Sequence, residues 1–284
     1  MSGNPGGDLI GALFQYHFMQ NALEVGTLVA LLAGAAGYFI VLRGQSFAAH
    51  MLSQVGFPGA AAGVLCHVSP VLGLVAFCVV AAVGITASGR RLEAGSRVES
   101  AAVGTILAFA LALGLLFFRL YHGSVQSVYG FLFGTILGIT DRDVTVTLVA
   151  AALALVALAL IARPLIFASV DPDVAEARGV PVRAISMAFM LIVALSVAVT
   201  VQVIGTLLIF ALLVAPGASA IQLTARPLLG LALTMVLALL FTWLGTAVAY
   251  FSGYPVGFFV TTLAFGCFGL LRVGRLAVGR LESA

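Results

Sequence analysis

Long apolar segments, separated by short polar ones, fill the chain from about residue 21 onward. Most have roughly the 20 residues that an α-helix needs to cross the hydrocarbon core of a bilayer. A further segment, 125–139, is too short to cross comfortably and predicts an external half-helix. The nine longer segments predict membrane spans at about residues 21–42, 47–66, 71–87, 101–118, 144–162, 184–201, 202–223, 228–251 and 256–271.

The composition agrees with this pattern and narrows the function. Of the 284 residues, 62% are hydrophobic and only 8% are charged. No soluble domain hides that much apolar surface, so we expect an all-α polytopic membrane protein, with residues 1–284 as one transmembrane domain. The chain contains no lysine. It therefore lacks the lysine of a P-loop ATPase, and any ATP hydrolysis would occur in another chain.

The arginines predict an orientation in the cell membrane. Nine crossings place the two termini on opposite sides. If the N-terminus is outside and the C-terminus cytoplasmic, only Arg119 and Arg142 fall outside, and all other arginines are cytoplasmic. The positive-inside rule favours this topology. Because the arginines are scattered at span ends, no nucleic-acid partner is expected.

The second predicted span contains unusual polar residues. His50 and Gln54 are four residues apart, so they share one helix face, and Pro58 and Gly59 follow at once. We expect a broken helix there, since polar groups beside a backbone discontinuity at membrane depth can replace the hydration of a substrate. The alternative is a Pro-kinked helix whose histidine bonds a neighbouring group.

A similar run recurs in the seventh span. Pro216 and Gly217 repeat the Pro58-Gly59 pair, and both are followed by small residues. In the predicted topology the two spans run in opposite directions. Matching breaks in two halves of a chain favour a central translocation site, although chance repetition in an Ala/Gly-rich sequence is the alternative.

The polar segment 168–181 predicts a short capped helix on the cytoplasmic side. Asp171 is a suitable N-cap, Pro172 suits the first helical position, and Gly179 can end the helix. A rigid capped helix between two spans suits docking into a partner protein, whereas an ordinary loop is the alternative. The residues expected to contact such a partner are Asp171, Pro172, Asp173, Glu176, Arg178 and Gly179.

Taken in order, several of these motifs resemble the membrane subunits of ABC importers for zinc and manganese. The matching blocks are Val41-Leu42-Arg43 followed by Ser46-Phe47, then Phe57-Pro58-Gly59, Tyr129–Gly134, Asp171-Pro172, Gly205-Thr206 and Leu213–Pro216. The resemblance implies a homodimer that imports a divalent metal ion, with the pore at the dimer interface. It also implies cytoplasmic ATP-binding subunits that dock on 168–181 and an external metal-binding protein, and no covalent cofactor.

One position departs from this family. Where the family has an aspartate and, four residues later, a histidine that handle the metal, this chain has His50 and Gln54. Imidazole suits zinc better than manganese, so zinc is the first expectation and manganese the second. Glu24, in the first span, is a third candidate ligand that could instead be structural.

Three other functions are less well supported. An iron-siderophore or cobalamin permease is related in fold, but such chains are generally longer. An ion-gradient-driven carrier needs buried carboxylates, and Glu24 is the one credible example. An intramembrane enzyme needs paired aspartates, a zinc-protease motif or a nucleophile beside a base, and the sequence shows none of these.

Overall fold

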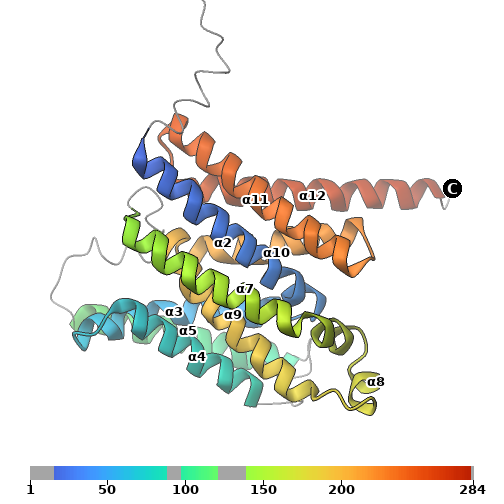
Figure 1. The fold of residues 1–284 in the computed structure, drawn as a ribbon, viewed down its shortest axis with the longest axis horizontal. Helices are drawn as coiled ribbons and strands as arrows, with labels where there is room; N and C mark the ends of the chain where they lie inside the picture. The colour runs from blue at the N-terminus through green and yellow to red at the C-terminus, as the bar shows by residue number, and fades with distance from the viewer. Residues whose placement is uncertain (1–15, 88–96, 121–138, 283–284) are drawn as a thin grey trace, which may run out of the picture.

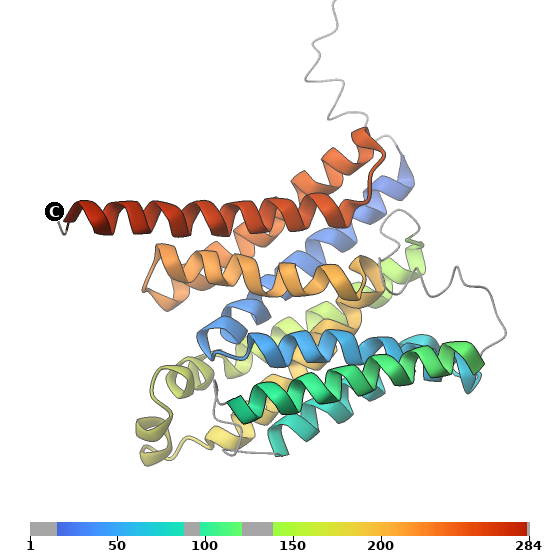
Figure 2. The same ribbon diagram turned by 180° about the vertical axis from the view of Figure 1, so that it is seen from behind.

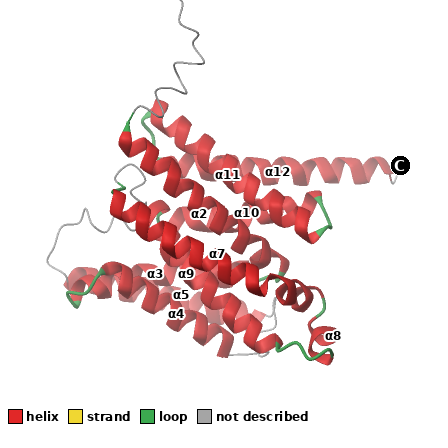
Figure 3. Ribbon diagram, in the orientation of Figure 1, coloured by secondary structure: helices red, strands yellow, loops and turns green. Residues whose placement is uncertain are grey.

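The protein is a bundle of helices. The computed structural model describes residues 16–87, 97–120 and 139–282, and this part of the chain contains no strand (Figure 3). The short α8 spans Pro172–Ala177. The long helices are α2 (His17–Leu42), α3 (Ser46–Leu65), α4 (Pro70–Ala87), α5 (Arg97–Leu120), α7 (Asp141–Val170), α9 (Val182–Ile204), α10 (Thr206–Leu223), α11 (Pro227–Ser252) and α12 (Val256–Glu282).

The helices form two groups joined by a middle pair (Figure 1). In one group α2, α10, α11 and α12 pack together, and in the other α3 packs on α4 and α5. Between the groups, α7 contacts α2, and α9 contacts α2, α3 and α4. Most of α2 is buried, as expected for a helix that is apolar on all sides.

Where the structure describes them, the predicted spans lie on helices, except that residues 202–204 of the span 202–223 belong to α9 rather than to α10. Residues 125–138 of the predicted half-helix lie outside the described residues. By length and composition α2, α7, α11, residues Val182–Val201 of α9 and Val256–Arg275 of α12 can each cross a membrane. Shorter apolar stretches lie in α4, α5 and α10. The first described residues of α2 and the end of α12 lie at opposite ends of the bundle, and α8 is at the end that holds the C-terminus (Figures 1 and 2).

The predicted helix breaks are not where the sequence placed them. α3 continues through Pro58 and α10 continues through Pro216. A proline removes one hydrogen bond to the carbonyl four residues earlier, and a packed membrane helix tolerates this loss. The predicted spans 184–201 and 202–223 meet at Gly205, whose φ of 86° ends α9 and begins α10. The chain turns back there, and α10 runs opposite to α3 (Figure 2).

The two Pro-Gly pairs serve as close helix contacts. A Cβ added to Gly59 would lie 2.6 Å from the carbonyl oxygen of Gly73 in α4. A Cβ added to Gly217 would lie 3.0 Å from the carbonyl oxygen of Gly37 in α2. Small residues let membrane helices approach backbone to backbone, where van der Waals contact holds them together. These glycines therefore determine how closely α3 packs on α4 and how closely α10 packs on α2.

We expect Gly37→Ala to destabilise the fold, because the added methyl would overlap the carbonyl oxygen of Leu213 in α10. Overpacking of this kind costs about 1–3 kcal/mol. Thermal unfolding of the purified subunit in detergent would show a lower Tm. Gly104→Ala is the control, since its Cβ would meet nothing within 4 Å. Equal melting temperatures for the two variants would contradict the close contact.

Candidate functional site

His50 and Gln54 lie on one side of α3, close to its start. His50 is in the second turn and is half-buried, and Gln54, one turn later, is 8% exposed. Ser53 lies between them, but its hydroxyl donates a hydrogen bond of 2.7 Å to the carbonyl of His50. Pro58 carries no N–H, so the Gln54 carbonyl lacks its usual donor within the helix. The site thus offers an imidazole, an amide and a carbonyl.

The imidazole of His50 packs against α10. Its ring lies edge-on to Phe210, with 4.7 Å between ring centroids and an interplanar angle of 64°. The Nδ1 atom of His50 is buried and has no hydrogen-bond partner. Leaving a buried polar atom unpaired costs about 1–3 kcal/mol. The bonding capacity of this nitrogen is therefore not used by any described residue.

Unpaired polar atoms are concentrated on α3 and α10. Among the described residues, the buried side-chain atoms without a partner are His50 Nδ1, Thr206 Oγ1 and Ser219 Oγ. Thr206 is one turn before Phe210, so the two share a face of α10. Other buried hydroxyls donate to the carbonyl four residues earlier, namely those of Ser196, Thr200, Thr234 and Thr242.

The sequence analysis did not identify Thr206, Phe210 or Ser219 as site residues. A usable signal for Thr206 was its place directly after Gly205, where a helix begins inside the apolar region. Phe210 could not have been found, since its role depends on how α10 packs on α3.

The structure does not place Glu24 with His50. Glu24 is exposed in the second turn of α2, whereas His50 follows the far end of α2. No group of three or more His, Cys, Asp or Glu side chains that could hold a metal ion exists within the described ranges.

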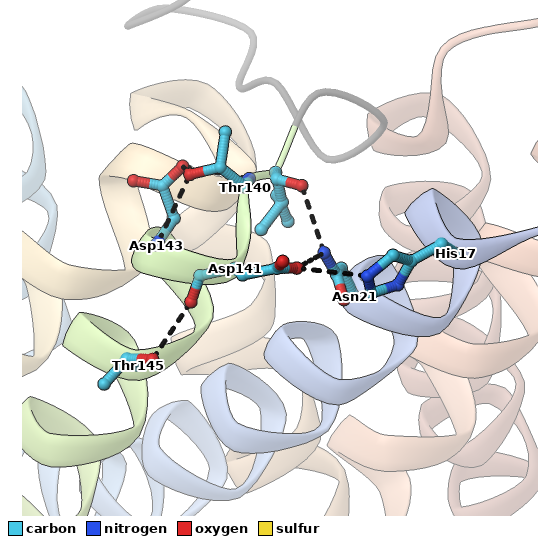
Figure 4. Close-up of polar contacts among 7 residues, drawn as sticks. His17, Asn21, Thr140, Asp141, Asp143 and Thr145 are labelled. Atoms are coloured by element: carbon cyan, nitrogen blue, oxygen red, sulfur yellow. Dashed lines mark hydrogen bonds and ion pairs between the residues drawn. The ribbon is translucent and has the colours of Figure 1, made fainter.

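A second polar cluster joins the first described residues of α2 to the start of α7 (Figure 4). Asn21 donates a hydrogen bond of 2.8 Å to Asp141, and His17 lies 3.4 Å from the same carboxylate oxygen. Thr140 and Asp143 form a capping box that begins α7. His17 and Asp141 are largely exposed. This cluster holds two helix ends together and is separate from His50.

The polar segment between α7 and α9 has the predicted caps. The Asp171 carboxylate accepts a hydrogen bond of 3.0 Å from the Val174 N–H, and Pro172 begins α8. Gly179 has a φ of 81°, and the Val180 N–H closes the turn on the Ala175 carbonyl at 3.0 Å. Residues 168–170 belong to α7 rather than to the short helix. The residues expected to contact a partner are all exposed: Asp171, Pro172, Asp173, Glu176, Arg178 and Gly179.

The sequence is similar to that of a known family of membrane proteins. The family model described as the ABC 3 transport family matches residues 15–272. The manganese transport system membrane protein MntC of Halalkalibacterium halodurans is 32% identical over 216 residues, which are 75% of this chain and 72% of that protein. The manganese import system permease protein ScaB of Streptococcus parasanguinis is 32% identical over 214 residues, 75% of each chain.

A solved structure resembles this fold closely. It is PsaBC from Streptococcus pneumoniae in complex with Fab, with a TM-score of 0.83 and 27% sequence identity. The match covers 93% of this chain and 94% of that one.

We expect His50→Phe to leave the Tm of the purified subunit unchanged or to raise it. The phenyl ring can keep the contact with Phe210, and the unpaired Nδ1 disappears. Asn21→Leu is the comparison, because it removes a buried amide that is paired with Asp141. Its expected cost is about 1–2 kcal/mol. If His50→Phe costs as much as Asn21→Leu, the imidazole is a structural group.

Proposed function

The chain belongs to the ABC 3 transport family, and we propose that it carries zinc across the membrane past His50 and Gln54. It is a multi-pass membrane protein, the permease subunit of an ABC importer for a divalent metal ion. ATP is hydrolysed in a partner chain, as the absence of lysine in this sequence also requires.

The observation that carries the proposal is the unpaired Nδ1 of His50. A neutral imidazole nitrogen is a common ligand for zinc. Gln54, which is buried one turn away on the same side of α3, would be the second and weaker donor. A transporter must bind its ion weakly enough to release it, so a sparse ligand set fits this role.

Zinc is the first candidate because the pair has no carboxylate. Manganese prefers oxygen ligands, and His50 with Gln54 offers a nitrogen and a neutral oxygen. Manganese is the second candidate, since the relatives MntC and ScaB are named for manganese transport.

The working unit in this proposal is a homodimer with the pore between two copies. Zinc sites take about four ligands, whereas one copy supplies one imidazole and one amide on α3. A second copy related by two-fold symmetry would double this set. The exposed apolar residues of α5, such as Phe109 and Leu115, are available to lipid or to a second subunit.

The proposal includes two further partner proteins. Cytoplasmic ATP-binding subunits would dock on 168–181, and an external metal-binding protein would deliver the ion. α8, the end of α2, the start of α11 and the last turns of α12 share one end of the bundle (Figure 1). Arg43 directly follows α2 and Arg226 directly precedes α11, so the positive-inside rule favours this end as the cytoplasmic one. The N-terminus would then be outside.

We expect His50→Ala to abolish metal uptake, because Gln54 remains as a lone weak donor. Gln54→His should keep or strengthen zinc uptake by adding a second nitrogen one turn away. The double variant His50→Asp, Gln54→His should shift preference toward manganese. Uptake of radioactive zinc and manganese by cells without other importers measures all of these.

The control for the uptake assay is His67→Ala, which removes an exposed histidine outside α3. It should transport as the parent does. Normal zinc and manganese uptake by His50→Ala would place the ligand elsewhere and refute the proposed pathway.

We expect changes in α8 to uncouple transport while the membrane fold persists. Replacing both Asp171 and Glu176 by Arg reverses the charge of its exposed surface, and Gly179→Val forces a β-branched residue into a positive φ. Co-purification with the ATP-binding subunit should fail, while the Tm of the subunit alone changes little. Arg226→Glu, in another turn at the same end, is the control. Normal association of both α8 variants would refute docking at 168–181.

A further inference from the structure

Arg43 has an unusual set of contacts at the end of α2. It is the first residue after the helix and is half-buried. Its guanidinium donates hydrogen bonds of 2.6 Å to the Ser186 hydroxyl and 3.4 Å to the Ser169 hydroxyl. Its Nε donates a bond of 3.3 Å to the Gln45 amide oxygen. It also lies 5.8 Å from the centre of the Phe189 ring.

These partners belong to three different segments of the chain. Ser169 is in the last turn of α7, two residues before the N-cap of α8. Ser186 is near the start of α9, just after the same segment. Gln45 is the N-cap of α3, five residues before His50. One side chain therefore contacts a residue inside 168–181, the start of α9 just after that segment, and the N-cap of the helix that carries the candidate site.

The bridge to α7 continues into its backbone. The Ser169 hydroxyl, while accepting from Arg43, donates a short hydrogen bond to the Leu165 carbonyl. A shift of the end of α7 therefore moves a group that is bonded directly to Arg43.

The charge of Arg43 is held by neutral acceptors. The groups that accept from its guanidinium are the hydroxyls of Ser169 and Ser186 and the amide oxygen of Gln45. A partly buried cation without a carboxylate is stable only if its N–H groups are bonded. The guanidinium is a planar fork with fixed donor directions, so its three neighbours are held in one relative geometry. A lysine at this position keeps the charge but cannot bond three groups in a plane.

We propose that Arg43 transmits the movement of the coupling segment 168–181 to α3 during transport. This inference rests on the proposed function, in which ATP-driven motion enters through that segment. Arg43 is a positioning residue: it sets where α3 begins, and hence where His50 and Gln54 lie, according to the position of α7 and α9. Its contacts would be remade as the partner subunits close and open.

The test uses the assembled transporter in proteoliposomes, with its ATP-binding subunit and binding protein. Zinc uptake and ATP hydrolysis are measured together in Arg43→Lys. The expected result is a ratio of zinc ions moved per ATP that falls about tenfold, the usual size of a lost coupling between sites, with ATP hydrolysis nearly unchanged. Arg226→Lys, an exposed arginine of the α10–α11 turn, is the matched control and should keep the parent ratio.

A second variant covers the case in which Arg43→Lys fails to assemble. Ser169→Ala with Ser186→Ala keeps the arginine and removes its bonds to α7 and α9, and it should lower the same ratio. If uptake and ATP hydrolysis fall in proportion, or if neither changes, Arg43 is structural and the inference is wrong.

The α8 variants, tested beside these, separate the two proposals. If the α8 variants couple normally, the proposal that partner subunits dock at 168–181 is wrong, and so is the inference about Arg43. If they uncouple but Arg43→Lys does not, docking stands and the inference about Arg43 falls.

Discussion

A buried polar atom in a membrane helix bundle costs free energy unless it is paired with another group or with a ligand, and the candidate site depends on this constraint. Most buried hydroxyls here are paired, and those of Thr200 and Thr234 donate to the carbonyl four residues earlier. His50 Nδ1 and Thr206 Oγ1 have no hydrogen-bond partner. Because unpaired groups cost free energy in a low-dielectric interior, their concentration on α3 and α10 marks where an ion could be accommodated.

Close glycine contacts make that arrangement possible. α10 packs closely on α2 through Gly37 and Gly217, and α3 packs closely on α4 through Gly59 and Gly73. With both helices fixed, the Phe210 ring reaches the imidazole of His50. Dispersion and small-residue packing, rather than a hydrophobic drive, hold membrane helices together, so these backbone contacts determine the geometry of the site.

Much of the fold was predictable because the length of an apolar segment and the residues that cap a helix are local properties of the sequence. The spans coincide with helices, and Asp171, Pro172 and Gly179 cap α8 as expected. The boundary between the spans 184–201 and 202–223 lies at Gly205, a few residues later than expected, because a glycine's positive φ does not show in a hydropathy pattern. The helix was expected to break at Pro58, but it continues through this residue. The separation of Glu24 from His50 and the contact with Phe210 depend on long-range packing, which no local pattern encodes.

In the proposed function, His50 binds the transported ion. Zinc K-edge X-ray absorption of the zinc-loaded, purified transporter tests it most directly, in a background where the other three histidines are replaced by alanine. If His50 is a ligand, the spectrum contains outer-shell scattering from imidazole carbons, and this scattering disappears in His50→Ala. A spectrum that lacks imidazole scattering, or that His50→Ala leaves unchanged, would contradict it.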